Sequence, residues 1–509
     1  MMVCRPQCSG HVALEPGAAW YSGRSDWSHT LNGMGPAEAL ASPPRPSRLS
    51  RLSLLKSMPV DRARLGVAAM AVLLRVAAAF VLTRAPKGLH DPVLYRGFAH
   101  GIAKGDGYLA LFGTPTAYYP PGYPFFLGAL QWVCNGLSIP THLPMVAALA
   151  QALLGGVMVW AVIGVGDLLD PAARRLRLGV VAGAVLAVWP NLVIHSTLLL
   201  SETLYLALFA CFLLVMVRTI QRGRIEPEPE PDPETGRGPD RGRRLSNAGG
   251  LAGSGVLLGS TVLVRPQALV IVASVGVVAL LVRGSWVQRV AAFALPVIAM
   301  VVVVAPWTVR NAGVFHEFVA VSTNGGDNMC IGFHTGATGG FEITPACETG
   351  EFYVNGPAAE ARHDDETGAR ATAWAEHHLG ALPALSARKL YNTYKDDHDA
   401  LMALESYGDD RWLSAGARSA IRWISDLFYD AVIVLAATGA AVVLRRMWED
   451  RRGRCRSNVQ WVFLIGVTVT SALVPLIVFG DPRFKLPTTP CFALLAALAG
   501  VSWTRRREK

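Results

Sequence analysis

The stretch LGVAAMAVLLRVAAAFVL, residues 65–82, decides the fold class of this chain, because Arg75 is its only charged residue. About 20 such residues in a helix cross the roughly 30 Å hydrocarbon core of a bilayer. Comparable runs recur at residues 143–166, 178–195, 198–217, 248–264, 267–282, 287–306, 422–444, 459–480 and 487–503. None alternates apolar and polar residues as barrel strands do. The sequence therefore predicts an all-α polytopic membrane protein with about ten transmembrane helices.

The charge of the chain supports the same conclusion. Of its 509 residues 52% are hydrophobic and only 17% are charged, with a net charge of +10. The basic residues cluster beside the apolar runs, at 174–177, 218–244, 283–289, 445–456 and 505–509. Lys and Arg mark cytoplasmic loops, so these segments and the N-terminus are expected inside. This pattern argues against nucleic-acid binding. The sequence also contains no phosphate-binding glycine loop of the kind that would indicate an ATPase.

Four parts of the chain can be distinguished by composition. Residues 1–57 are rich in Ser, Pro, Gly and Arg without an apolar period, which predicts a disordered cytoplasmic extension. Residues 58–505 form the membrane domain. Within it, residues 221–246 alternate Pro with charge and predict a disordered cytoplasmic linker. Residues 506–509 are a basic cytoplasmic tail.

Two segments are expected on the outer side. Residues 83–142 form the first external loop, and within it residues 124–136 are apolar but short. A full crossing there would place every later basic loop outside, so we expect a re-entrant or dipping segment. Residues 307–420 form a hydrophilic external segment with loosely helical spacing of apolar residues. Together the external loops are expected to form a small α-rich cap.

With this topology, the polar residues at the span ends converge on the outer face. They are Asp91, His195, Ser201, Glu202, Arg265, Arg310, Asn311, Asp481, Arg483 and Lys485. Ionisable groups are costly to dehydrate near a membrane, so their convergence favours a functional site. Each residue taken singly can simply mark the point where water begins.

An ordered set of motifs then carries a resemblance. It consists of Asp91 with Tyr95, Gly105-Asp106-Gly107-Tyr108, Pro120-Pro121-Gly122-Tyr123-Pro124, Ser201-Glu202-Thr203, Pro306-Trp307-Thr308-Val309-Arg310-Asn311, residues 321–328 and Arg483-Phe484-Lys485-Leu486-Pro487. Over roughly residues 60–505, the chain resembles the membrane-embedded (C-type) glycosyltransferases of family 39. This family includes the protein O-mannosyltransferases and the bacterial lipid A aminoarabinose transferases.

The resemblance implies an enzyme of the bacterial plasma membrane with its active site on the extracytoplasmic face. It would transfer a hexosyl or pentosyl group from a polyprenyl-phosphate sugar to a glycan, lipid or protein acceptor. The family's first acidic motif is often Asp-Glu, whereas here Pro92 follows Asp91. The role usually assigned to that Glu therefore has no counterpart at this position.

The reaction needs a base and cationic groups on one face. Asp91 is the candidate general base, because the acceptor hydroxyl must lose a proton as it attacks. Its alternative role is a helix start, since Asp-Pro commonly begins helices. Arg310 and Arg483 are the first candidates for the donor phosphate, because a guanidinium grips phosphate oxygens as a planar fork. Lys485 and Arg265 are second candidates.

Further residues are candidates for binding the sugar or the acceptor: Glu202, Tyr95, Tyr119, Tyr123, Asn311, Asn324 and Asn328. Each type has an alternative role. A Glu at a helix start complements the helix dipole, interfacial tyrosines form membrane belts, and Asn favours turns. Cys330 and Cys347 both lie in the external segment, where a disulfide is possible.

No cofactor is expected, and a divalent cation is the less favoured alternative. His90 and Asp91 could pair with His195 or Glu202, but no usual ligand spacing is present. A lipid-linked sugar flippase or transporter is the alternative function. It should show internal repeats and charges deep in its spans, and here only Arg75 fits the second condition.

Overall fold

The computed structural model describes residues 62–110, 113–138, 142–170, 177–222, 241–281, 285–342, 344–347, 356–451 and 459–507. The predicted N-terminal extension, residues 1–57, lies outside these ranges. Within them the chain is helical, and its β structure consists of two isolated bridges, Leu109 with Pro115 and Gly340 with Gly480. The all-α fold class is confirmed.

In the described part of the chain, eight helical stretches are long and apolar enough to span a membrane. They correspond to α1 (Arg62–Leu82), α4 (Leu143–Leu169), α7 (Glu202–Arg222), α8 (Arg241–Val264), α10 (Trp286–Phe315), α15 (Ala415–Arg451), α16 (Val459–Ala472) and α18 (Thr489–Arg507). The shorter α5 (Leu178–Val188) and the pair η2 (Pro266–Val270) and α9 (Ile271–Leu281) occupy the two remaining predicted spans. The best window of α18 is 83% buried and that of α1 only 17%, so α18 is central and α1 peripheral.

The predicted span 178–195 is broken, and Arg75 explains how the break is tolerated. Pro190 starts a second helix, α6 (Pro190–His195), after α5 ends at an extended Trp189. The buried Arg75 donates from Nη1 to Ala187 O at 3.1 Å and from Nη2 to Leu186 O at 3.2 Å. The one charge noted inside a predicted span therefore satisfies carbonyls at the end of α5.

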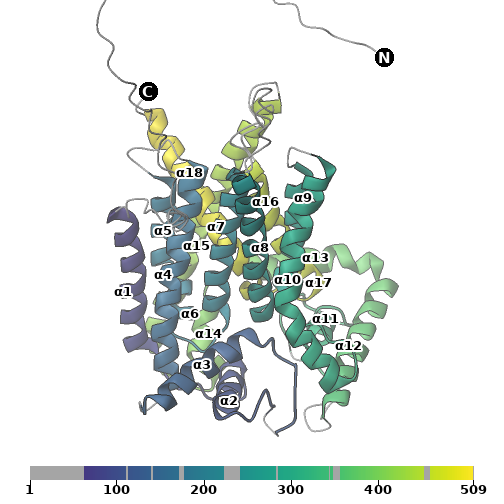
Figure 1. The fold of residues 1–509 in the computed structure, drawn as a ribbon. Helices are drawn as coiled ribbons and strands as arrows, with labels where there is room; N and C mark the ends of the chain where they lie inside the picture. The colour runs from purple at the N-terminus through teal and green to yellow at the C-terminus, as the bar shows by residue number, and fades with distance from the viewer. Residues whose placement is uncertain are drawn as a thin grey trace, which may run out of the picture. The chain divides into compact units, whose positions relative to one another are not determined.

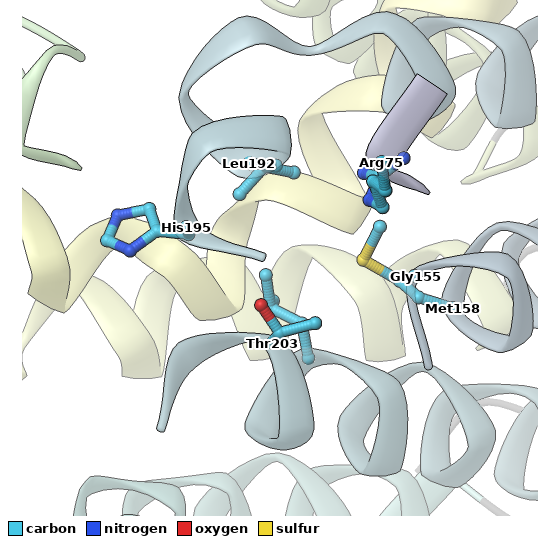
Figure 2. Close-up of a pocket in the computed structure, with 7 residues that line it drawn as sticks. Arg75, Gly155, Met158, Leu192, His195 and Thr203 are labelled. Atoms are coloured by element: carbon cyan, nitrogen blue, oxygen red, sulfur yellow. The ribbon is translucent and has the colours of Figure 1, made fainter. Parts of the chain in front are cut away.

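A small cavity lies beside Arg75 and is lined also by Gly155, Met158, Leu192, His195, Thr203 and Leu206 (Figure 2). Its volume is about 10 Å³, the size of one water molecule and far below that of a sugar. This cavity is therefore not a substrate site.

One end of the helical bundle carries the two predicted external segments (Figure 1). The first contributes α2 (Asp91–Lys104) and α3 (Gly122–Gly136). The 15 residues of α3 make a helix roughly 22 Å long, shorter than the hydrocarbon core. Its packing is close, since a Cβ on Gly122 would lie 2.9 Å from Leu263 O. Whether α3 dips or spans stays a prediction.

The second segment begins later than expected, because α10 continues to Phe315 and so includes residues 307–315. It then forms a helical cap of α11 (Gly325–Gly332), α12 (Pro357–His377), η3 (Leu379–Ala381), α13 (Leu382–Tyr394), α14 (Asp399–Leu404) and η4 (Ser406–Gly408). Two short elements, α17 (Val474–Ile477) and η5 (Pro482–Thr488), connect α16 to α18 at the same end (Figure 1).

The predicted linker and tail are shorter than the sequence indicated. Helix α7 extends to Arg222 and α8 begins at Arg241, so both ends of the 221–246 linker are helical. Helix α18 likewise continues to Arg507, into the predicted 506–509 tail. Residues 223–240 and 508–509 lie outside the described ranges. Charged residues at a span end prolong a helix into water, so the loss of apolar character does not mark its last turn.

Candidate active site

Arg483 joins two carboxylates that are both far from it in the chain. Its Nη1 lies 3.0 Å from Asp91 Oδ2, and its Nε lies 2.5 Å from Glu202 Oε1. Arg483 is carried by η5, whose N-cap Asp481 accepts the Arg483 backbone N–H at 2.8 Å. Three of the residues predicted for catalysis or binding therefore meet at one point.

Asp91 is the first residue of α2, and His90 is the N-cap. The Asp91 side chain is directed at other elements: Oδ2 accepts from Arg483, and Oδ1 accepts from the Tyr119 hydroxyl at 2.8 Å. It is 26% exposed, so a substrate hydroxyl can reach it. Each carboxylate oxygen has a second lone pair for such a partner.

Glu202 is fully buried behind this pair and begins α7. Its Oε1 also lies 3.1 Å from Nη1 of Arg265, which precedes η2. The carboxylate thus lies between two guanidinium groups, which offsets the cost of burying its charge. Glu202 complements the dipole of α7 as well, so its alternative role fits the geometry, whereas its full burial keeps it from contacting a sugar or an acceptor directly.

The three predicted tyrosines have different roles. Tyr119 donates to Asp91, and burial together with the negative charge of Asp91 holds its pKa well above the usual value, so it remains a donor. The Tyr95 ring packs edge-on against Tyr119 and Tyr123, with centroids 5.1 and 5.0 Å apart. Tyr123 turns into the bundle and donates to Gln151 Oε1 at 3.1 Å.

Arg310 and Asn311 hold a loop in place. Arg310 Nη1 donates to Thr116 O at 2.8 Å, and its guanidinium lies 4.7 Å from the centre of the Trp307 ring. Asn311 is buried and donates to Val319 O at 3.1 Å. Arg310 therefore contacts its own helix and the chain before Tyr119, and the charge pair of Asp91 and Arg483 is formed without it.

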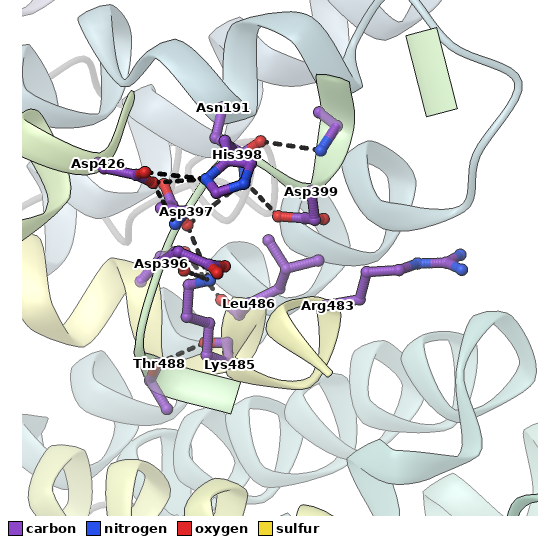
Figure 3. A network of polar contacts seen from close by, with 12 residues as sticks. Asn191, Asp396, Asp397, His398, Asp399, Asp426, Arg483, Lys485, Leu486 and Thr488 are labelled. Carbon is purple, nitrogen blue, oxygen red and sulfur yellow. Dashed lines mark hydrogen bonds and ion pairs between the residues drawn. The ribbon is translucent and has the colours of Figure 1, made fainter. Parts of the chain in front are cut away.

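Lys485 belongs to a separate buried network (Figure 3). Its Nζ lies 3.0 Å from Asp397 Oδ1 and donates to Asp396 O at 2.7 Å. Asp397 also accepts from Trp189 Nε1 at 2.6 Å. Lys485 and Asp397 are both essentially inaccessible, while the Arg483 side chain points away from them (Figure 3). The structure thus separates Lys485 from the Asp91 group.

The same network includes His195, which the sequence placed on the outer face. Its Nε2 lies 3.0 Å from Asp399 Oδ2, and Asn191 donates to Asp399 Oδ1 at 2.8 Å. Asp397 and Asp399 were not among the predicted residues. Their only sequence signal is the acidic run Asp396–Asp399 in a basic chain, and that run does not say which carboxylate is buried.

The remaining predicted residues lie in the cap. Asn324 is the N-cap of α11, where its Oδ1 accepts from Ser322 Oγ and its backbone carbonyl accepts from the Asn328 N–H. The side-chain bond of Asn324 is local, as its alternative role in a turn expects, whereas the Asn328 bond is a backbone bond of the helix and gives its side chain no role. Cys330 and Cys347 form a disulfide, with Cα atoms 5.7 Å apart.

Among the described residues, no three His, Cys, Asp or Glu side chains are grouped to hold a metal ion.

An apolar groove of about 340 Å³ adjoins the site. It is lined by Pro121, Gly122, Phe125, Leu263, Val303, Pro306 and Trp307, which come from α3 with its preceding proline, α8 and α10. Pro121 follows Tyr119 by two positions, and Leu263 precedes Arg265 by two. The groove therefore begins beside residues that contact Asp91 and Glu202.

The arrangement of helices is similar to that of a solved oligosaccharyltransferase, so the predicted resemblance to membrane-embedded glycosyltransferases is confirmed at the level of the fold. The chain is similar to the oligosaccharyltransferase of Archaeoglobus fulgidus tethered to an acceptor peptide, with a TM-score of 0.50, 12% identity, and 87% of this chain and 50% of that chain covered. For the apo form of that enzyme the TM-score is 0.50 and the identity 14%, with 89% of this chain and 52% of that chain covered.

ArnT from Cupriavidus metallidurans bound to undecaprenyl phosphate matches with a TM-score of 0.37 and 15% identity over 86% of this chain and 77% of that one. The chain spans about half the length of the oligosaccharyltransferases it matches. No protein-family model and no curated protein matches the chain.

Proposed function

We propose that this chain is a glycosyltransferase that moves a hexosyl or pentosyl group from a polyprenyl-phosphate donor to a hydroxyl acceptor. The acceptor would be a glycan, a lipid or a protein, and transfer would take place at the outer face of a bacterial plasma membrane. The observation that carries the proposal is the partly exposed Asp91 carboxylate 3.0 Å from the Arg483 guanidinium, next to an apolar groove.

The two side chains supply complementary chemistry for this reaction. The acceptor hydroxyl donates its proton to Asp91 as its oxygen forms a bond to the anomeric carbon. The bond from that carbon to the phosphate oxygen breaks, and the departing phosphate takes the electron pair. Arg483, with Arg265 behind it, stabilises the charge that develops there. In this proposal the two arginines supply the positive charge without a divalent cation.

The groove supports a lipid-linked donor. Its seven lining residues are all apolar or glycine, and it lies between helices expected to face lipid. An isoprenoid chain lying there would place its phosphate beside Arg265, because Leu263, which lines the groove, lies two residues before that arginine. A water-soluble nucleotide sugar would gain nothing from such a surface.

The test uses the full chain in vesicles of defined lipids with radiolabelled polyprenyl-phosphate sugars. Asp91→Asn should lower the transfer rate by roughly 10²–10⁴-fold while donor binding is kept, because the base is lost and the side chain keeps its shape. Asp106→Asn is the matched control, since Asp106 is an exposed aspartate just beyond the same helix. A chelator should leave transfer unchanged.

Two outcomes would contradict the proposal. Equal activity of the Asp91→Asn and wild-type chains would show that Asp91 is not the base. An absence of transfer with every sugar offered, together with movement of labelled lipid between leaflets, would favour the alternative flippase or transporter function.

A further inference from the structure

Glu360 is a carboxylate that none of the sequence motifs singled out. It lies in the first turn of α12 and is only 3% exposed. A Glu near a helix start is common because it complements the helix dipole, so the sequence gives no reason to choose it. Its surroundings in the structure are unusual, because both of its oxygens accept from other parts of the chain.

Three hydrogen bonds end on this carboxylate. Oε2 accepts from the Thr116 hydroxyl at 2.7 Å, and Oε1 accepts from the Ala117 backbone N–H at 2.8 Å and from the Thr323 hydroxyl at 2.5 Å. Thr116 and Ala117 are more than 240 positions away in the chain. Such charge-assisted bonds offset the cost of burying the carboxylate and fix the position of the loop.

Other contacts hold the same few residues. The Thr323 backbone N–H donates to Ala117 O at 3.0 Å, and Arg310 donates to Thr116 O at 2.8 Å. The Tyr118 hydroxyl donates to Asp327 Oδ2 at 2.8 Å, and Asp327 Oδ1 lies 2.6 Å from Nε2 of His363 on α12. Each of the three consecutive residues 116–118 is therefore held by at least one hydrogen bond to the cap.

The next residue is Tyr119, whose hydroxyl donates to Asp91. Only Tyr118 separates Ala117 from Tyr119, so the position of the Ala117 backbone limits where the Tyr119 side chain can lie. We infer that Glu360 is a positioning residue: it holds residues 116–117 and thereby keeps the Tyr119 hydroxyl on the Asp91 carboxylate. This inference rests on the proposed function, in which Asp91 is the base.

The first experiment measures the holding role without any transfer reaction. In wild-type and Glu360→Ala chains, backbone hydrogen exchange of residues 113–121 is followed by mass spectrometry. Glu360→Ala should speed exchange in this segment at least tenfold, because the Ala117 N–H loses its acceptor. Glu366→Ala is the matched control, since Glu366 lies on the same helix and is exposed. Unchanged exchange in Glu360→Ala would overturn the inference.

The second experiment is a double-mutant cycle with Tyr119→Phe. Glu360→Ala should lower kcat roughly tenfold in the wild-type background with little change in KM, and less than twofold when Tyr119 is already Phe. An equal loss in both backgrounds would overturn the inference, because Glu360 would then act independently of Tyr119. So would faster exchange with undiminished kcat.

A conservative variant keeps the test valid if Glu360→Ala folds poorly. Glu360→Gln retains an oxygen for the Ala117 N–H and should restore slow exchange and most of kcat, and Thr116→Val should reproduce part of the loss. If Glu360→Gln restored neither slow exchange nor kcat, the inference would be overturned. If the wild-type chain transfers no sugar, the proposed function and the catalytic consequence fall together, while hydrogen exchange still decides the holding role.

Discussion

The guanidinium of Arg483 lies 3.0 Å from the carboxylate of Asp91, although 392 positions separate the two residues in the chain. The same guanidinium contacts the fully buried Glu202, which is itself held by Arg265. Asp91 and Arg483 are the partly exposed members of this group and Glu202 the buried one. The geometry provides a charge pair that substrates can reach, supported by a buried carboxylate that they cannot reach.

Arg483→Lys should lower kcat by roughly 10²–10³-fold, because a single ammonium nitrogen cannot replace the two separate nitrogens, Nη1 and Nε, that contact Asp91 and Glu202. Arg310→Lys should cost less than tenfold, since Arg310 contacts loop carbonyls rather than the charge pair. Steady-state kinetics at varied donor concentration measures both. A larger rise of the donor KM for Arg310→Lys would instead place the phosphate at Arg310.

Val303→Trp should fill the apolar groove and raise KM at least tenfold for long-chain donors, a loss of about 1.4 kcal/mol or more in binding. The neighbouring Val302 is 64% exposed and does not line the groove, so Val302→Trp is the matched control. A donor with a short isoprenoid chain should be less affected by Val303→Trp. Equal effects of the two variants would show that the lipid chain lies elsewhere.

Loss of the Cys330–Cys347 disulfide should destabilise the cap by about 3 kcal/mol, because the bond closes a short loop between residues 17 positions apart. Thermal unfolding in detergent with and without reductant measures this. The Cys330→Ser/Cys347→Ser chain should unfold at the temperature of the reduced wild type and should not respond to reductant. A wild-type chain that is insensitive to reductant would contradict the prediction.

Lys389 should make stability depend on pH. Its buried Nζ has no hydrogen-bond partner among the described residues and lies 3.2 Å from the centre of the Phe333 ring. Burial lowers its pKa from 10.5 to about 7, so between these values the unfolded chain binds a proton that the folded chain does not. Stability should therefore rise as pH increases from about 7 to 10.5.

Melting temperatures measured from pH 6.5 to 9.5 test this dependence. Lys389→Met should flatten the rise, whereas Arg388→Met should leave it intact, because Arg388 is exposed. A slope that survives in Lys389→Met would assign the effect to another group.

The spans were predictable because a helix must be apolar along the whole thickness of the bilayer, and ten such runs occur in the sequence. Their ends were less predictable. Helix α10 continues nine residues past Pro306 to Phe315, since its last turns are stabilised by contacts such as Asn311 with Val319 that no local pattern shows. The break at Pro190 depends on Arg75 from another helix.

The sequence by itself determined the fold class and a set of polar residues at the span ends, because hydrophobic length and charge are local properties. It could not separate Arg483 from Arg310, and it placed Lys485 second only because of its residue type, since all three are basic residues near the end of an apolar run. Only the packing of α2, α7 and η5 decided that Arg483 meets Asp91 and Glu202, while Lys485 is buried with Asp397. Ion pairs form between side chains that approach within about 4 Å, and that distance is set by the tertiary structure.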